Sequence, residues 1–319
     1  MTRRGPLPDP FPGTAFSTRS ATEAGITAGR LRGQDLASPT RGLRVPARSP
    51  VDIAEWLRAL QELAPDAVVH RVTAARLLGL PLPPALASAR RIELAVPAGR
   101  QRPRRPGLEC RRLKLAPGDV VNHDGLRVTS LERTFLDLAS VLALGDLVAV
   151  GDYLVCEHSR PFMAKQTARV PLAALQRYVA GTKGNHGVRR AREAAGLVRV
   201  GADSPPETKL RLAVTDLGLP EPVLNWAIRD AGGREVVWPD LAFPDYQVAV
   251  QYDGGHHRTG LQSGFDRHRN QATLLHGWSN ILIRPEDILA AGYDGAARQV
   301  RDALVARGWA PLAPLVWRS

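Results

Sequence analysis

Four oxygen-bearing side chains in the last third of the chain have types and spacing that suit a magnesium ion. Glu207 falls on an expected helix, and Asp240, in a Pro-Asp pair, ends an expected strand. Gln251 and Asp253 stand two residues apart in a strand expected over 246–253, so the alternation of strand side chains places them on one face. The turn between the two strands could bring Asp240 beside them. Because Mg²⁺ prefers hard oxygen ligands, this pattern predicts a Mg²⁺ site.

These side chains need elements that bring them together, and the surrounding pattern supplies such elements. The expected segments are a helix over about 205–217, strands over 223–229, 235–243 and 246–253, a helix over 265–276, a strand over 280–283 and a helix over 294–307. Ala231-Gly232-Gly233 predicts a hairpin between the first two strands. The order α-β-β-β-α-β is the core order of the PD-(D/E)xK nuclease fold.

This stretch resembles the nuclease-like domains related to the very-short-patch repair endonucleases. The matching residues are Glu207, Asp240-Leu241-Ala242-Phe243-Pro244, Gln251-Tyr252-Asp253-Gly254, His256, His257, Asp266, Arg269 and Gly277-Trp278. The resemblance implies hydrolysis of DNA with Mg²⁺ or Mn²⁺, which Glu207, Asp240 and Asp253 would bind. His256 or His257 would act as an acid–base or supporting group, and Arg269 would hold the scissile phosphate or pair with Asp266 on its own helix.

The chain departs from that family at Gln251, where the family usually has glutamate. An amide offers the metal a neutral oxygen in place of a charged one, which weakens its attraction for Mg²⁺. Two hypotheses therefore stay open: a metal-dependent DNA endonuclease, and a DNA-binding regulator that kept a non-catalytic nuclease fold.

The composition favours a nucleic-acid partner. The 319 residues carry a formal net charge of +12, and arginine, whose forked donors suit phosphate, supplies nearly all of the positive charge. The alternative source of this charge is an arginine-rich genome. Cys110 and Cys156 are too few for a disulfide framework, which favours a reducing cytoplasm. No run of 18 apolar residues occurs, so we expect no membrane span.

The first part of the chain predicts a DNA-binding motif. A short helix near Ser20 to Glu23, a break at Ala24-Gly25-Ile26, a second helix from Thr27 to about Leu36 and a basic strand over 40–46 together form the pattern of a winged helix-turn-helix. The arginines expected to face DNA phosphates are Arg30, Arg32, Arg41 and Arg44. A small helical layer packed on the rest of the chain is the alternative.

Residues 15–160 resemble the AbiEi-type antitoxin family. The matching segments are Ala24-Gly25-Ile26-Thr27, Thr40-Arg41-Gly42, residues 73–80, residues 126–138 and Gly151-Asp152. The resemblance implies a winged helix with a second domain and a DNA-binding repressor of a toxin operon, with a cognate toxin as a further partner. Arg133 and Asp137, one helical turn apart, can pair and are expected to be structural.

We therefore expect a mixed α/β chain with a winged-helix-like segment, an α+β middle domain and a C-terminal restriction-endonuclease-like domain. The expected divisions are a disordered tail over 1–14, the winged-helix-like segment over 15–85, the middle domain over 86–160, a helical linker over 161–203 and the nuclease-like domain over 204–319. The predicted protein is cytoplasmic and binds DNA. We expect no membrane partner, and the protein can self-associate into a homo-oligomer.

Overall fold

The computed structural model shows a mixed α/β protein with several sheets and divides into two compact units. It describes residues 7–9, 11, 13–47, 52–160, 165–254 and 269–311. Unit 1 comprises residues 1–142 and 181–191, and unit 2 comprises residues 143–180 and 192–319. Within the described part of the chain, no helix has the length and apolar character needed to cross a membrane.

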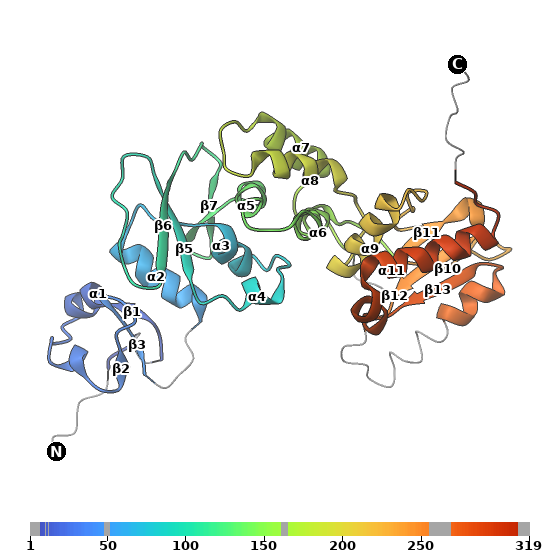
Figure 1. Cartoon of the computed structure of the whole chain (residues 1–319). Helices are drawn as coiled ribbons and strands as arrows, with labels where there is room; N and C mark the ends of the chain where they lie inside the picture. The colour runs from blue at the N-terminus through green and yellow to red at the C-terminus, as the bar shows by residue number, and fades with distance from the viewer. Residues whose placement is uncertain are drawn as a thin grey trace. The chain divides into compact units, whose positions relative to one another are not determined.

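Unit 1 begins with a small layer of short elements (Figure 1). They are β1 (Phe16–Ser17), α1 (Thr18–Glu23), the 3₁₀ turn η1 (Arg30–Arg32), β2 (Leu36–Ala37) and β3 (Leu43–Pro46), with strand order β1-β3-β2. The predicted helix from Thr27 to Leu36 is wrong, because only η1 is helical there. Gly29 and Gly33 flank η1, and glycine disfavours continued helix. Phe11, in the predicted disordered tail, is buried against Phe16, with 5.0 Å between ring centroids.

The larger part of unit 1 is a five-stranded sheet with order β6-β5-β4-β8-β7. Its strands are β4 (Val68–Val69), β5 (Ile92–Pro97), β6 (Leu108–Leu113), β7 (Val120–His123) and β8 (Leu126–Thr129), and its helices are α2 (Ile53–Leu63), α3 (Arg71–Leu77), α4 (Pro84–Ala87) and α5 (Leu131–Leu138). β4 is central and pairs antiparallel with β5 and parallel with β8. The sheet therefore joins segments on both sides of the predicted boundary at residue 85.

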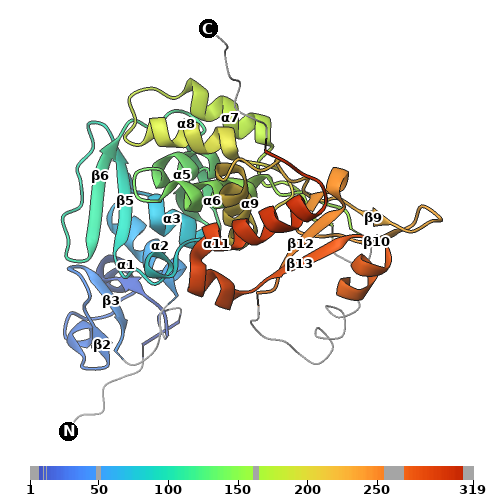
Figure 2. The same cartoon turned by 45° about the vertical axis from the view of Figure 1, so that its right-hand side comes forward.

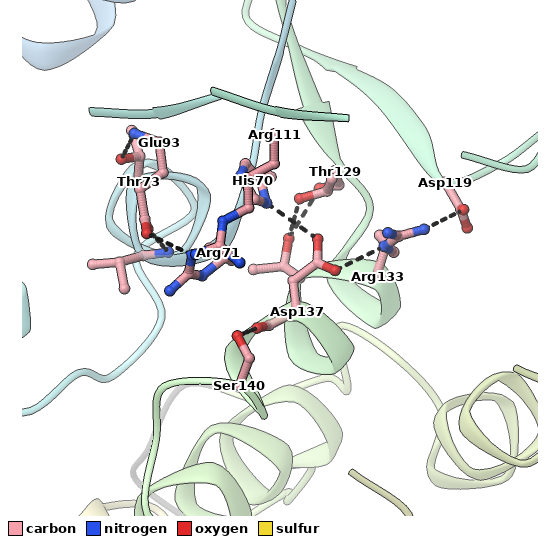
Figure 3. A network of polar contacts seen from close by, with 12 residues as sticks. His70, Arg71, Thr73, Glu93, Arg111, Asp119, Thr129, Arg133, Asp137 and Ser140 are labelled. Atoms are coloured by element: carbon pink, nitrogen blue, oxygen red, sulfur yellow. Dashed lines mark hydrogen bonds and ion pairs between the residues drawn. The ribbon is translucent and has the colours of Figure 1, made fainter. Parts of the chain in front are cut away.

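A buried polar network ties α5 to this sheet, and Figure 3 shows it. Arg133 Nε lies 3.0 Å from Asp137 Oδ1, and Arg133 Nη1 lies 2.8 Å from Asp119 Oδ2. His70 Nδ1 lies 3.6 Å from the other oxygen of Asp137. The prediction that Arg133 and Asp137 pair on one helix is confirmed. Because both side chains are buried and paired with each other, removing either one would leave an uncompensated charge in the core of unit 1.

Unit 2 contains α6 (Leu144–Val155), all but the last residue of α7 (Leu172–Gly181) and the C-terminal part of α8 (Val188–Leu197). These are followed by α9 (Pro205–Asp216), β9 (Ile228–Arg229), β10 (Glu235–Val237), β11 (Leu241–Phe243), the 3₁₀ turn η2 (Pro244–Tyr246), β12 (Val248–Tyr252), β13 (Ser279–Ile283) and α11 (Pro285–Ala306). Residues 269–275 are also helical.

The central sheet of unit 2 has the order β11-β12-β13. β11 runs antiparallel to β12, and β13 runs parallel to it. Figures 1 and 2 both show α9 and α11 side by side over this sheet. Val248 and Val250 face the core that these helices form, whereas Ala249 packs on the opposite face with Trp278 and Ala272. The predicted alternation of the strand over 246–253 is thus confirmed for the part that forms β12.

Candidate active site in unit 2

Glu207 is fixed at the N-terminus of α9. Ser204 is the N-cap residue, and its hydroxyl donates to Glu207 Oε1 at 2.7 Å. The backbone N–H of Asp203 donates to Glu207 Oε2 at 2.9 Å. Glu207 is the third residue of the helix, where a carboxylate that accepts hydrogen bonds from the chain before the helix stabilises its start. Both carboxylate oxygens therefore already have partners within the chain.

Asp240 lies directly before β11, so the prediction that it ends a strand is wrong. The predicted strand over 235–243 is interrupted at residues 238–240, where Pro239 cannot donate a backbone hydrogen bond. Asp240 Oδ2 accepts from the backbone N–H of Tyr252 at 2.6 Å. Since Leu241 pairs with Val250, Asp240 stands opposite Gln251 on the neighbouring strand. The carboxylate is anchored at the edge of the sheet.

The structure brings Glu207 and Asp240 into one electrostatic neighbourhood. Burial, and next the negative charge of Asp240, raise the pKa of Glu207 to about 8. Burial also raises the pKa of Asp240, while its bond to Tyr252 N–H and the charges of Arg269 and Arg160 lower it. Like charges in a poorly solvated site disfavour double ionisation. The two acids therefore favour holding a proton, or binding a cation, at neutral pH.

We expect the unfolding free energy to depend on pH because of this raised pKa of Glu207. An ordinary glutamate ionises near pH 4.5, and Glu207 near pH 8. Between these values the folded state holds more protons than the unfolded state, so stability should fall as pH rises. Glu207→Gln, which keeps a hydrogen-bonding oxygen in the cap, should flatten this fall. Urea unfolding of both proteins from pH 5 to pH 8 measures the difference. Identical slopes for the two proteins would contradict the assignment.

Gln251 is fully buried, and within the described part of the chain its side-chain oxygen has no hydrogen-bond partner. Its Nε2 donates to Thr273 Oγ1 at 3.4 Å, and the Thr273 hydroxyl donates to the Arg269 carbonyl at 2.9 Å. Because that hydroxyl proton is already used, Thr273 can only accept from Gln251, which fixes the orientation of the amide. Among the described residues, Gln251 Oε1 is left buried with no hydrogen-bond partner. A buried acceptor in this state is costly, so this oxygen could accept a bond from a ligand.

The remaining predicted residues are placed in part. Asp253 directly follows β12, is partly exposed, and its N–H donates to the Ile283 carbonyl at 2.8 Å. Arg269 begins the described part of the helix over 269–275 and lies close enough to Asp240 to lower its pKa. His256, together with His257 and Asp266, lies outside the described residues.

A second cation beside the acids was missed by the sequence analysis. Arg160 Nη1 lies 2.6 Å from Asp203 Oδ2, and Arg160 Nη2 donates to Asn225 Oδ1 at 2.5 Å. Asn225 in turn donates to the Glu157 carbonyl at 3.2 Å. The charge of Arg160 lowers the pKa of Asp240, so this side chain shares the acids' neighbourhood. No local motif signals it, because Arg160 and Asn225 stand far apart in sequence.

Three metal-binding side-chain types meet next to this site. Cys156, His158 and Asp203 place one ligand atom each within 4.8 Å of one another, and among the described residues Glu207, Asp240 and Asp253 do not form such a group. The pKa of the Cys156 thiol rises to about 12, because of burial and then the hydrogen bond to Asp203. The sequence analysis considered Cys156 only together with Cys110, as too few cysteines for a disulfide framework. Its spacing from His158, two positions on, was the available signal.

The predicted DNA-binding arginines of unit 1 have different environments. Arg30 forms two bonds to Asp35, at 3.0 and 2.7 Å. Arg44 donates to the Leu31 carbonyl at 2.7 Å and so holds the small layer together. Arg32 is exposed. Among these three arginines, Arg32 is therefore the most accessible to a phosphate, whereas Arg44 has a structural role.

Arg41, the fourth predicted arginine, lines a basic cavity of about 740 Å³ in unit 1. Its other basic lining residues are Arg102, Arg104, Arg105 and Arg112. Asp66 is the acid in the lining, and it pairs with Arg100 at 3.6 Å. We call this the arginine cavity. Such a concentration of guanidinium groups attracts phosphate.

Comparisons with known proteins give limited information. No family model matches the chain, and no solved structure matches it. Uncharacterized proteins from two strains of Mycobacterium tuberculosis are each 29% identical to it over 127 residues. That region covers 39% of this chain and 46% of each relative. The chain thus spans less than half the length of the curated relatives it matches, and their printed names give no activity.

Proposed function

We propose that this chain is a DNA-binding protein whose unit 2 hydrolyses phosphodiester bonds with a divalent cation. The observations that carry the proposal are the buried, like-charged pair of Glu207 and Asp240 and the position of Gln251 opposite Asp240 in the strand register. Both acids have raised pKa values, and the charge of Asp240 contributes to that of Glu207. Gln251 Oε1 is buried with no hydrogen-bond partner among the described residues. Asp240 and Gln251 offer oxygen atoms of the kind that Mg²⁺ or Mn²⁺ prefers.

The residues present fit a divalent cation. Asp240 would supply a charged ligand and Gln251 Oε1 a neutral one, with Asp253 following on the same strand face. A bound cation would activate water and stabilise charge that develops on the phosphate. Glu207 would contribute electrostatically from its cap, because both of its oxygens already accept hydrogen bonds. A cation would also satisfy the buried amide oxygen and offset the repulsion between the acids.

The cations around the acids suit a DNA phosphate. Arg269 and Arg160 both act on Asp240 electrostatically, and an arginine near the acids can orient a phosphate group and offset its charge. Arg160 is held by Asp203 and Asn225, so it is already positioned. In the central sheet, α9 is followed by β11, β12, the helix over 269–275 and β13, with β11 antiparallel and β13 parallel to β12. This sheet has one strand fewer before the helix than the predicted α-β-β-β-α-β order, because β9 and β10 pair in a sheet of their own; the order otherwise supports the proposed restriction-endonuclease-like fold.

The test is incubation of the full chain with supercoiled plasmid in Mg²⁺, Mn²⁺ or EDTA. We expect nicked or linear plasmid with either cation and none with EDTA, because the proposed site needs the ion. Separation of plasmid forms by electrophoresis measures this. Intact plasmid under all three conditions, with protein that circular dichroism shows to be folded, would contradict the catalytic proposal.

A second candidate function is a DNA-binding, antitoxin-like transcriptional regulator with a non-catalytic unit 2. It is favoured by the same cap: Ser204 and Asp203 already occupy both oxygens of Glu207. The amide of Gln251 also lowers the negative charge available to a metal. This candidate predicts DNA binding that needs no divalent cation, and it becomes the favoured function if no cleavage is seen.

The arginine cavity supports DNA binding under both functions, and it gives a separate prediction. Replacing Arg102, Arg104 and Arg112 together by serine should weaken binding to duplex DNA, because each arginine that meets a phosphate releases a counterion. Affinity decreases as salt concentration rises, and the magnitude of this negative slope of log affinity against log salt concentration should decrease by about two to three. Fluorescence anisotropy with labelled DNA at several salt concentrations measures both quantities.

The matched control for this prediction removes arginine charge elsewhere in unit 1. Arg19→Ser with Arg32→Ser takes two exposed arginines from the α1–η1 region, where the sequence predicted the DNA contact. If the control lowers the salt slope and the cavity variant does not, the α1–η1 region binds DNA and the arginine cavity does not.

A further inference from the structure

We propose that Cys156, His158 and Asp203 form a zinc site in unit 2. One ligand atom from each residue lies within 4.8 Å of the other two. Cys156 Sγ lies 3.2 Å from Asp203 Oδ1, and His158 Nε2 lies 3.2 Å from the same oxygen. Tetrahedral zinc with ligand bonds of 2.0–2.3 Å separates its ligands by about 3.3–3.8 Å. Small side-chain shifts would therefore bring all three onto one ion.

The chemistry of the three ligands selects the metal. A thiolate and an imidazole are soft or borderline donors that favour zinc over Mg²⁺, and a carboxylate is a common third ligand. Asp203 is the most solvent-exposed of the three, with 29% of its side chain accessible against 8% for His158. Water can therefore supply the fourth ligand from the Asp203 side.

The surrounding chain holds the ligands in place before any ion binds. Cys156 is the C-cap residue of α6. His158 is fixed by a bridge in which it and Gln166 exchange backbone hydrogen bonds of 3.0 and 3.1 Å. Asp203 directly precedes the cap of α9, and its N–H is bound to Glu207. A preformed arrangement lowers the entropy cost of binding the ion.

Arg160 fixes the carboxylate without blocking the ligand atom. It pairs with Asp203 Oδ2 at 2.6 Å, whereas Oδ1 is the oxygen that Cys156 and His158 share. Partners of this kind orient a metal-binding carboxylate. A zinc ion with one thiolate and one carboxylate is electrically neutral as a unit, so the guanidinium charge does not prevent its binding. The ion would join the end of α6, the 156–160 segment and the start of α9.

The test measures zinc itself and is independent of DNA cleavage. The 319-residue chain is stripped with EDTA, supplied with Zn²⁺, dialysed and analysed by mass spectrometry for metal content. We expect one zinc ion per chain, and close to none for Cys156→Ser or His158→Gln. Cobalt in place of zinc should give a thiolate-to-cobalt absorption band that Cys156→Ser abolishes. A large excess of Mg²⁺ should not displace the zinc.

Cys110→Ser is the matched control, because it removes the other cysteine of the chain, which lies in unit 1. It should bind as much zinc as the wild type. Cys156→Ser keeps a hydroxyl that can donate to Asp203, and circular dichroism checks that this variant folds. No zinc on the wild type, or equal zinc on the wild type and a folded Cys156→Ser, would overturn the proposal. Active plasmid cleavage with no bound zinc would leave the nuclease proposal standing and remove the zinc site.

Discussion

Asp240→Asn is expected to reduce the rate of metal-dependent DNA cleavage by about 100-fold or more and to leave unit 2 folded. The loss of a charged metal ligand raises the barrier, and about 2.7 kcal/mol corresponds to a factor of 100. Asparagine keeps an oxygen that can accept from Tyr252 N–H, as Asp240 Oδ2 does at 2.6 Å. It also removes the repulsion that raises the pKa of Glu207. The variant should therefore be at least as stable as the wild type without metal.

Initial rates of plasmid nicking in Mg²⁺ and a thermal melt of each protein measure these two effects. Asp245→Asn is the matched control, since it removes an exposed carboxylate five positions along the chain, and it should cleave at the wild-type rate. Cleavage by Asp240→Asn at the control's rate would show that Asp240 binds no catalytic cation. Loss of cleavage in both variants would show that the loss in Asp240→Asn is not specific to a metal ligand.

Gln251→Glu in the same assay distinguishes a working site from a decayed one. The new carboxylate would be fully buried opposite Asp240, so it should lower the melting temperature without metal. Added Mg²⁺ should restore the lost stability, because the ion compensates the extra charge, and cleavage should rise. If Mg²⁺ neither restores stability nor permits cleavage, the regulator hypothesis gains.

The helix that carries Glu207 could be predicted because its signals are local. Ser204, Pro205 and Glu207 form a helix start of known type, and α9 indeed runs from Pro205 to Asp216, one residue short of the prediction. The alternation of β12 is also local, and it correctly placed Gln251 on the face away from Val248 and Val250. Short-range periodicity therefore accounts for two of the elements that position the candidate site.

Other features depend on contacts that no local pattern contains. Gly292, with φ 66° and ψ −178°, divides α11 into two helical segments. The second segment agrees with the predicted helix over 294–307, whereas the segment from Pro285 to Gly292 was missed. Arg160 joins the site through Asn225, 65 positions away, and only the folded chain brings the two together. The convergence of Cys156 and Asp203, 47 positions apart, has the same origin. Charged or polar partners across such distances have no periodic signature.

Arg211→Met is expected to lower the unfolding free energy of unit 2 by about 3–5 kcal/mol, the largest stability effect that we predict. Arg211 and Asp152 are 2% and 1% exposed, and Arg211 Nη2 lies 2.9 Å from Asp152 Oδ2. Asp152 also accepts from Thr208 Oγ1 and Arg199 N–H, both at 2.8 Å. It therefore joins α6, α9 and the segment after α8. Methionine would leave this carboxylate buried without its cation.

Urea unfolding at pH 7 measures the loss, and Glu221→Gln is the matched control. Glu221 pairs with Arg199 at 2.7 Å, but both side chains are well exposed, so its removal should cost at most about 1 kcal/mol. A loss for Arg211→Met no larger than the control's would mean that the buried pair contributes little.

Acid should reduce the loss in Arg211→Met. Burial already raises the pKa of Asp152 above its usual 3.8, and the Arg211 charge is the chief factor that lowers it again. Without Arg211 the folded-state pKa rises further, so below it the folded variant holds a proton that the unfolded chain lacks. Its stability relative to the wild type should therefore recover as pH falls towards 3.8. A pH-independent difference would show that lost packing of the arginine, rather than an uncompensated charge, causes the destabilisation.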